Sequence, residues 1–248
     1  MATGIGIGIA GDVFQEKAGA GIGPDPFLDM YSVQFDGVDE YLTASNAPAF
    51  GTGDFTINFW AYRTSTTGSQ KVLSKTVGSA TEFQIAFLGS GGVQWSSTLW
   101  PDGGGAGLVS TNDTWEMWSY TVSQSTNTAT WYKNGANPNA KDITGLTGTF
   151  GDGELRFGRY NTVYNYAGNL DEISFWNVAL TGANLLDIYN SGKPNDLSKL
   201  SFGANLTNWW RMGDPQGPSA YPTIVDSVGS ADMTMTNMAS SNITTNVP

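Results

Sequence analysis

The sequence predicts an all-β fold, an antiparallel β-sandwich with one short helix. Short segments in which apolar and polar residues alternate with a period of two are the first indication. Clusters of Gly, Asn and Ser separate these segments, as turns do between strands. The hydrophobic share of 40%, with 9 Trp, 10 Tyr and 12 Phe, suffices for a large core. At 248 residues such a sandwich is commonly a single domain.

The strands are expected where this alternation is clear. In DFTINFWAYR, Phe55, Ile57 and Phe59 point to one face and the residues between them to the other, which predicts a strand with one buried face. Asn134-Gly135 is a strong hairpin-turn signal. The expected strands are 32–36, 41–45, 54–63, 70–75, 82–89, 93–97, 115–123, 128–135, 154–160 and 169–177, with 205–214 and 231–238 in the C-terminal segment.

One helix is expected in LTGANLLDIYNSGKP. Thr181 has a side chain that suits an N-cap, and apolar residues from Leu185 to Tyr189 follow at helical spacing. Gly192 and Pro194 then act as stop signals. The helix is short, so it is expected to pack against an edge of the sandwich.

Residues 1–30 are rich in Gly and predict an extended N-terminal arm. Two interpretations stay open: a flexible arm, or an arm that orders as an added strand on a neighbouring subunit. In the second, the alternating Ile5, Ile7 and Ile9 would fill pockets of the partner. The arm also contains G-x-G-x-x-G at 6–11, but no strand precedes it, so nucleotide binding is not expected.

Charge and composition exclude several classes of function. A net charge of −11 with 11 scattered basic residues argues against nucleic acid and against anionic membranes as partners. With no Cys and no His, the chain has no disulfide, thiolate–zinc site, Ser-His-Asp triad or histidine base. Any metal would be a hard cation on oxygen ligands, above all Ca²⁺. No segment is apolar enough for a membrane span, and the N-terminus lacks the features of a signal peptide, so secretion by the usual route is not expected.

Several segments taken in order resemble one known family. They are SVQFDGVDEYLTAS, DFTINFWAYR, WEMWSYTVS, TWYKNG, LRFGRY and YAGNLDEISFWNVALTGANLLDIYNSG. Over residues 32–192 the chain resembles the concanavalin A-like, laminin-G-like jelly-roll family. The resemblance implies two face-to-face antiparallel sheets of six or seven strands, with a concave side that often binds glycans.

The C-terminal segment extends this resemblance. NWWRMGD and PTIVDSVGSADMTMTNM resemble the segment that opens many domains of the family, although here it comes last. Residues 201–248 are therefore expected to complete the sandwich of residues 31–248 rather than to form a second domain.

The whole arrangement also resembles virion proteins of bacteriophages. This resemblance implies a non-enzymatic structural protein located on the virion, either a capsid decoration or cement protein or a head- or tail-fibre component. Its partners would be other virion proteins, such as major capsid or tail subunits, reached through the N-terminal arm. A homo-oligomer is a further arrangement that the sequence permits.

Two adjacent acids, Asp171 and Glu172, could suggest a sugar-cleaving enzyme. Neighbours on a regular strand point to opposite faces, so Glu172 would share a face with Ser174 and Trp176, and Asp171 the other face with Ile173. A glycosidase needs two carboxyls across one sugar, and glucanases of this fold carry acids at alternating positions, E-x-D-x-x-E or E-x-D-x-E. No catalytic residue is therefore predicted. Asp171 is expected to accept hydrogen bonds from a turn, and Glu172 to face solvent or a neighbouring strand.

No cofactor is predicted, but Ca²⁺ remains an option in one turn. FDGVDEYL carries Asp36, Asp39 and Glu40 around a glycine, and three oxygen ligands in five residues could bind Ca²⁺. The alternative is a β-turn, which Asp and Gly favour for backbone reasons. The loops 214–226 and 150–154 are similar candidates.

The aromatic residues divide into core and loop positions. Those in strand segments are expected in the core: Trp60, Trp118, Trp131, Phe157 and Phe175. Trp100, Tyr160, Tyr164 and Tyr166 lie in or beside loops instead, where they could contact a protein partner, contact a glycan or pack within the loop. The second of these options gives the alternative function, a carbohydrate-binding adhesin or receptor-binding module for a cell-surface glycan.

Overall fold

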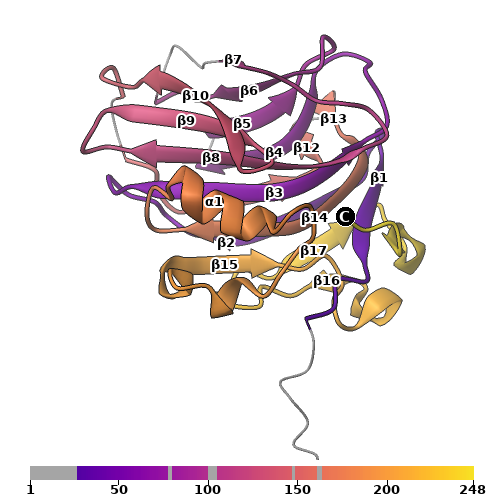
Figure 1. The fold of residues 1–248 in the computed structure, drawn as a ribbon. Helices are drawn as coiled ribbons and strands as arrows, with labels where there is room; N and C mark the ends of the chain where they lie inside the picture. The colour runs from indigo at the N-terminus through magenta and orange to yellow at the C-terminus, as the bar shows by residue number, and fades with distance from the viewer. Residues whose placement is uncertain (1–26, 78–79, 100–104, 147–148, 161–163) are drawn as a thin grey trace, which may run out of the picture.

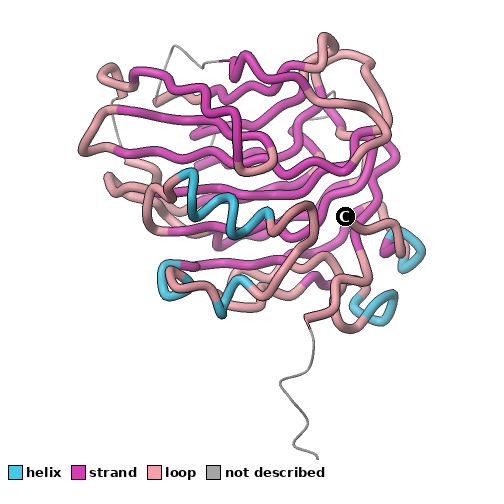
Figure 2. Tube along the Cα trace, in the orientation of Figure 1, coloured by secondary structure: helices cyan, strands magenta, loops and turns pink. Residues whose placement is uncertain are grey.

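Two antiparallel β-sheets stacked face to face make up most of the structure (Figure 1). The computed structural model describes residues 27–77, 80–99, 105–146, 149–160 and 164–248. Within these ranges the strands form two eight-stranded sheets and one two-stranded ribbon, joined by the loops and short helical turns of Figure 2. The predicted two-sheet antiparallel sandwich with one short α-helix is confirmed, although each sheet has more strands than the six or seven expected.

The first sheet has the strand order β10-β9-β8-β3-β14-β1-β18, and β15 pairs with part of β14. Its strands are β1 (Ser32–Asp36), β3 (Phe55–Arg63), β8 (Trp115–Ser123), β9 (Thr128–Lys133), β10 (Ala136–Asp142), β14 (Ala167–Trp176), β15 (Leu206–Trp210) and β18 (Ile243–Thr244).

The second sheet has the order β16-β17-β2-β11-β4-β5-β6-β7. Its strands are β2 (Tyr41–Ala47), β4 (Gln70–Val77), β5 (Ala80–Phe87), β6 (Gly92–Ser96), β7 (Gly105–Val109), β11 (Gly153–Phe157), β16 (Thr223–Ile224) and β17 (Met233–Thr236). The ribbon pairs β12 (Arg159–Tyr160) with β13 (Tyr164–Asn165). Short 3₁₀ turns occur at Leu197–Lys199, Gly203–Asn205, Gly217–Ala220 and Ser240–Asn242.

The main core lies between the two sheets and is rich in stacked rings. Trp95 of β6 stacks on Phe83 of β5 at 4.6 Å and, across the sandwich, on Tyr120 of β8 at 4.3 Å. Such ring pairs stabilise a core beyond the area they bury. The five aromatic residues expected in the core are all buried, which confirms that prediction.

A second apolar cluster lies on the outer face of the first sheet, beneath α1 (Gly182–Tyr189). Trp60 of β3 stacks on Tyr189 of the helix at 5.6 Å, and Leu185 and Ile188 are buried there. The expectation that β3 buries only one face is therefore wrong. Its residues alternate as predicted, but the helix covers the face that the sequence alone would leave to solvent.

The helix begins and ends as predicted. Asn184 N donates to Oγ1 of the N-cap Thr181 at 3.2 Å, and the Asn184 side chain accepts from Thr181 N at 3.1 Å, which completes a capping box. Asn190 ends the helix in the left-handed conformation. No helix in the described ranges is long and apolar enough to cross a bilayer.

The C-terminal segment adds strands to both sheets. β15 pairs with β14, β18 pairs with β1, and β17 pairs with β2. Trp210 of β15 is fully buried and meets Phe175 edge to face at 5.1 Å, so this segment contributes to the main core. Of the predicted arm, only its last residues, from Phe27, are described; Ile5, Ile7 and Ile9 lie outside the described residues.

One irregularity in β14 positions several charged side chains. Residues 167–170 pair with β1 and residues 173–176 with β15, so the partner of β14 changes at residues 171 and 172. On its other side β14 pairs with β3, with a register shift between Asp171 and Ser174. Glu172 has a φ of +45°, in the left-handed region. This is a β-bulge, and it inserts one extra residue on the outer face of the sheet.

Candidate functional site

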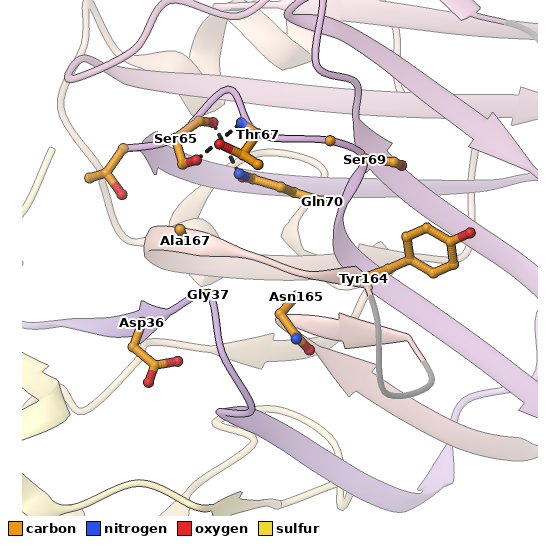
Figure 3. A pocket seen from close by; sticks show the side chains of 11 residues that line it. Asp36, Gly37, Ser65, Thr67, Ser69, Gln70, Tyr164, Asn165 and Ala167 are labelled. Atoms are coloured by element: carbon orange, nitrogen blue, oxygen red, sulfur yellow. Dashed lines mark hydrogen bonds between the residues drawn. The ribbon is translucent and has the colours of Figure 1, made fainter.

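A cleft of about 580 Å³ opens where the end of β1, the β3–β4 loop, β13 and the start of β14 meet (Figure 3). Its lining is mostly polar and small: Asp36, Gly37, Thr64, Ser65, Thr67, Gly68, Ser69, Gln70, Tyr164, Asn165 and Ala167. The polar side chains of 65–70 lie on one side, Asp36 and Asn165 on the other, and the Tyr164 ring at one end.

The β3–β4 loop is held in shape by its own hydrogen bonds. Thr67 N donates to Ser65 Oγ at 3.1 Å, and Gln70 Nε2 donates to Ser65 O at 3.1 Å. Thr64 N donates to Ala167 O at 3.1 Å and so ties the loop to β14. Gln70 is 3% exposed, and its buried Oε1 has no hydrogen-bond partner. What the loop contributes to the lining of the cleft is therefore mainly its Ser and Thr residues.

The opposite wall is built by the turn after β1 and by Asn165. Val38 N donates to Asp36 Oδ1 at 2.7 Å, and Asn165 Nδ2 donates to Val38 O. The amide oxygen of Asn165 is buried and has no hydrogen-bond partner within the described part of the chain. Gly37 has a φ of +79°, and a Cβ there would lie 2.9 Å from Ala167 Cβ, so only glycine allows this close approach.

Tyr164 supplies the aromatic surface of the cleft. It is 39% exposed, and its ring stacks on that of Tyr160 at 6.5 Å with an interplanar angle of 22°. Lys71 Nζ lies 5.5 Å from the centre of the Tyr164 ring, and burial lowers the pKa of this lysine. A hydrogen bond of 2.8 Å between the Tyr160 hydroxyl and Thr81 Oγ1 holds the Tyr160 ring in place. Of the predicted binding residues, Tyr164 thus lines the cleft, and Tyr160 lies next to it as its stacking partner without lining the cleft.

The other two predicted binding residues do not join them. Tyr166 is fully buried, its ring packs edge to face on Phe35, and its hydroxyl donates to Asn169 O at 3.1 Å. The prediction that Tyr166 binds a ligand is corrected on this ground: it follows Asn165 by one residue and points into the core. Trp100 lies outside the described residues.

The cleft offers mostly uncharged hydrogen-bonding groups next to an aromatic ring. The Ser and Thr hydroxyls of the lining can donate or accept, and the half-exposed ring of Tyr164 can stack. Among the described lining residues Asp36 is the one carboxylate. The described wall therefore holds no pair of acids of the kind a glycosidase uses.

Asp171 and Glu172 lie elsewhere, and the prediction that they face opposite sides is wrong. Because of the bulge, both point to the outer face of the first sheet, whereas Leu170 and Ile173 on either side belong to the main core. Both acids are buried, at 0% and 2% exposed. Glu172 faces a neighbouring strand, which is the second of the two alternatives expected for it. Its carboxylate accepts from Trp209 Nε1 of β15, the strand that pairs with β14, and, at 3.2 Å, from Arg211 Nε.

Two further acids join this pair. Asp29 precedes β1 and Asp214 follows β15, and each lies close enough to affect the pKa of its neighbours. Burial raises the pKa of Glu172 to about 8, opposed by Arg211, and raises that of Asp29 to about 7. Burial also raises the pKa of Asp171 well above its usual range, and Asp29 and Glu172 add to the effect. These four residues are called the acidic cluster below.

The chain matches the model of one known protein family. The family model described as the concanavalin A-like lectin/glucanases superfamily (Laminin_G_3) matches residues 36–185. The chain belongs to this superfamily. No curated protein matches its sequence.

Solved structures share the fold of this concanavalin A-like domain at low sequence identity. A candidate carbohydrate-binding protein from Bacteroides ovatus aligns with a TM-score of 0.66 and 15% identity, over 86% of this chain and 59% of its own. The chain thus spans less than two thirds of that protein. A heptameric SAP-like pentraxin from Limulus polyphemus aligns with a TM-score of 0.55 and 13% identity, over 67% of this chain and 86% of its own. The extracellular region of zebrafish Gpr126/Adgrg6 aligns with a TM-score of 0.53 and 15% identity, over 63% and 22%.

The turn proposed for Ca²⁺ in this concanavalin A-like domain has other partners for its acids. Asp36 accepts from Val38 N, Glu40 from Asp36 N at 2.7 Å and Asn242 Nδ2 at 2.8 Å, and Asp39 from Asn237 Nδ2 at 3.0 Å. These bonds fit the β-turn alternative. Within the described part of the chain, the carboxylates that do converge are those of Asp29, Glu172 and Asp214.

Sequence reasoning missed most of the cleft wall and half of the acidic cluster. The run TSTTGSQ at 64–70 was visible as a loop rich in small hydroxyl residues. Nothing local indicates that it faces Asn165, which is far away in the sequence. The loop at 214–226 was noted for its acids, but only the fold brings Asp214 to Asp29 and Glu172.

Proposed function

We propose that this concanavalin A-like domain is a non-catalytic carbohydrate-binding module, and that the cleft beside Tyr164 is its glycan site. One observation carries the proposal: the half-exposed Tyr164 lines one open cleft together with the hydroxyl residues of the β3–β4 loop. Sugars present apolar ring faces and many hydroxyl donors, and this lining complements both. The name of the Bacteroides ovatus protein with the same fold supports the same ligand class.

The placement of the acids supports a non-catalytic role. Asp171 and Glu172 are buried on the outer face of the first sheet, beneath Trp209 and Arg211. The cleft lies at the far end of β1, so a glycan bound there would not reach them.

The test is retention of the full chain on a broad glycan array. We expect Tyr164→Ala to weaken the response to the best glycan about tenfold, which is ~1.4 kcal/mol, while the far-UV spectrum and thermal midpoint stay unchanged. Tyr221→Ala is the matched control, because Tyr221 is a similarly exposed tyrosine, 42% against 39%, and does not line the cleft. No retained glycan, or equal retention by the Tyr164 variant, would refute the glycan site.

A structural role on a bacteriophage particle is a second candidate function. The observation that favours it is the way the chain enters the sandwich: Arg211 Nη2 donates to Leu28 O, and Met30 N donates to Asp214 Oδ2 at 3.0 Å. Residues 27–31 are thereby fixed at the start of β1, while the cleft lies at its end. A preceding arm could attach to capsid or tail subunits without covering the cleft.

This second candidate is tested by deletion. If the arm attaches the protein to virions, a variant lacking residues 1–26 should lose co-sedimentation with purified particles and keep its thermal midpoint. Undiminished co-sedimentation would remove the attachment role, and it would leave the glycan site unaffected.

A further inference from the structure

Charge is distributed unevenly around the cleft beside Tyr164. Its described lining residues include one carboxylate, that of Asp36, and no lysine or arginine. Asp36 is exposed and lies on the wall opposite the β3–β4 loop (Figure 3). A charged ligand group that enters the cleft would therefore meet one negative charge and no positive charge on the described walls.

The turn after β1 holds this carboxylate in place and adds further negative charge. Asp36 Oδ1 accepts from Val38 N at 2.7 Å, and Asp36 N donates to Glu40 Oε2 at 2.7 Å. Burial raises the pKa of Glu40, and the charges of Asp36 and Asp39 add to this effect. The acids of the turn thus act on one another over a short distance, and together they make the potential at this wall negative.

Two basic residues beside the lining segments do not offset these acids at the surface. Arg63, at the end of β3, is 1% exposed, and its Nη2 donates to Leu88 O at 2.8 Å. Lys71, in β4, is 8% exposed, with its Nζ 5.5 Å from the centre of the Tyr164 ring. Neither side chain lines the cleft, so neither offers a direct ion pair to a ligand bound there.

The net charge of the chain acts in the same direction as Asp36. Its 22 acidic and 11 basic residues leave a charge of −11, which slows the approach of anions. At physiological ionic strength charges act over only about 8 Å. A ligand in contact with the cleft is therefore influenced mainly by the charge on its wall, and that charge is Asp36.

We propose that the cleft selects uncharged sugars and that Asp36 is the residue that excludes carboxylated and sulfated ones. This inference rests on the proposed glycan site and names its ligand class: neutral hexose or N-acetylhexosamine chains, as opposed to uronates and sulfated glycans. Like charges placed opposite each other at an interface suppress the wrong partner. A neutral sugar meets no such repulsion and binds through the hydroxyls and the ring of the cleft.

The test compares neutral glycans with anionic counterparts on one array, using the full chain. The pairs are galactose and galacturonate oligomers, glucose and glucuronate oligomers, and N-acetyllactosamine without and with 6-sulfate. We expect each retained neutral member to bind at least about tenfold more tightly than its counterpart at ~10 mM salt, where charges act over about 30 Å. This ratio should shrink at ~1 M salt, where they act over about 3 Å.

Two variants locate the selectivity in one side chain. Asp36→Asn should raise retention of the anionic members at least about threefold at ~10 mM salt, because the local repulsion is gone. Asparagine still accepts from Val38 N, so the turn should persist. Asp39→Asn is the matched control: it removes an exposed carboxylate of the same turn that does not line the cleft, so it changes the net charge equally and should leave the ratio unchanged.

The outcomes separate this inference from the glycan site itself. Anionic members that bind as tightly as their neutral counterparts at low salt would overturn the selectivity and leave the glycan site standing. Equal ratios in the two variants would overturn the role of Asp36. No retention of any glycan would overturn the glycan site, and this inference with it. The salt dependence of the wild-type chain keeps the test decisive if a variant fails to fold.

Discussion

The two ends of β1 carry opposite kinds of polar site. At its end, an open cleft presents neutral amides, hydroxyls and one exposed ring. At its start, the acidic cluster is buried under aromatic residues and holds several carboxylates around one arginine. Open neutral groups suit a ligand that exchanges with solvent, whereas the buried acids are held by Arg211, Trp209 and one another. The difference in burial and charge therefore separates recognition from structural support.

The largest expected effect on stability contrasts a tyrosine of the core with a nearby tyrosine at the cleft. Tyr164 and Tyr166 are two residues apart, one at the cleft and one in the core. Tyr166→Ala should lower the free energy of unfolding by about 3–5 kcal/mol, since it leaves a large cavity. Tyr164→Ala should lower it by less than about 0.5 kcal/mol. Denaturant titration of both variants measures the contrast, and similar losses would show that the cleft ring is structural.

The next effect tests charge compensation in the acidic cluster. Arg211→Ala removes the cation that contacts Glu172 and Asp214, and with it the packing on Phe27. Removing one partner of a buried ion pair typically costs about 3 kcal/mol or more. Lys199→Ala, at an exposed site, is the control and should change stability by less than about 0.5 kcal/mol. Urea titration of both variants decides, and an Arg211 variant as stable as the control would contradict this account.

How far the sequence predicts these features depends on whether the signal is local. The capping of α1 by Thr181 and the alternation in β3 are local, and both were predicted correctly. The burial of the second face of β3 was not predicted, because it depends on a helix far along the chain. Tyr160 and Tyr164 were found as loop aromatics, but the walls that face them come from β1 and the β3–β4 loop.

The bulge at Glu172 is the clearest example of a feature that the sequence does not predict. Adjacent acids on a regular strand point to opposite faces, and nothing in NLDEISFW signals that Glu172 adopts a left-handed conformation. The bulge arises where β14 exchanges its partner β1 for β15. A pairing of this kind involves three segments, so no window of sequence contains it.

A smaller effect on stability is expected from pH, through the acidic cluster. The folded pKa values of Glu172 and Asp29, about 8 and about 7, lie above the ~4 of unfolded carboxyls. Folded protein then binds more protons, so stability is full below about pH 4 and declines as pH rises through 7 and 8. The other charged groups that face them are Asp171, Asp214 and Arg211.

We therefore expect the thermal midpoint to fall by a few degrees between about pH 5.5 and pH 8.5. Scanning calorimetry across this range measures it. Glu172→Gln should flatten the decline, because the glutamine carries no proton to lose. A midpoint that rises over the same range would contradict the raised pKa values.

The smallest effect is expected on glycan affinity at the cleft, which carries little charge. Its described wall has one carboxylate, Asp36, so Asp36→Asn should change glycan affinity by less than about threefold. Asparagine can also keep the turn, since it accepts from Val38 N as aspartate does. Glu172→Gln should leave affinity unchanged as well, because the acidic cluster lies about 16 Å away along β1, at ~3.3 Å per residue. Isothermal titration of both variants at low and at high salt tests this. A larger loss in Asp36→Asn would show that its carboxylate contacts the glycan, and a loss in Glu172→Gln would show that the two ends of β1 are coupled.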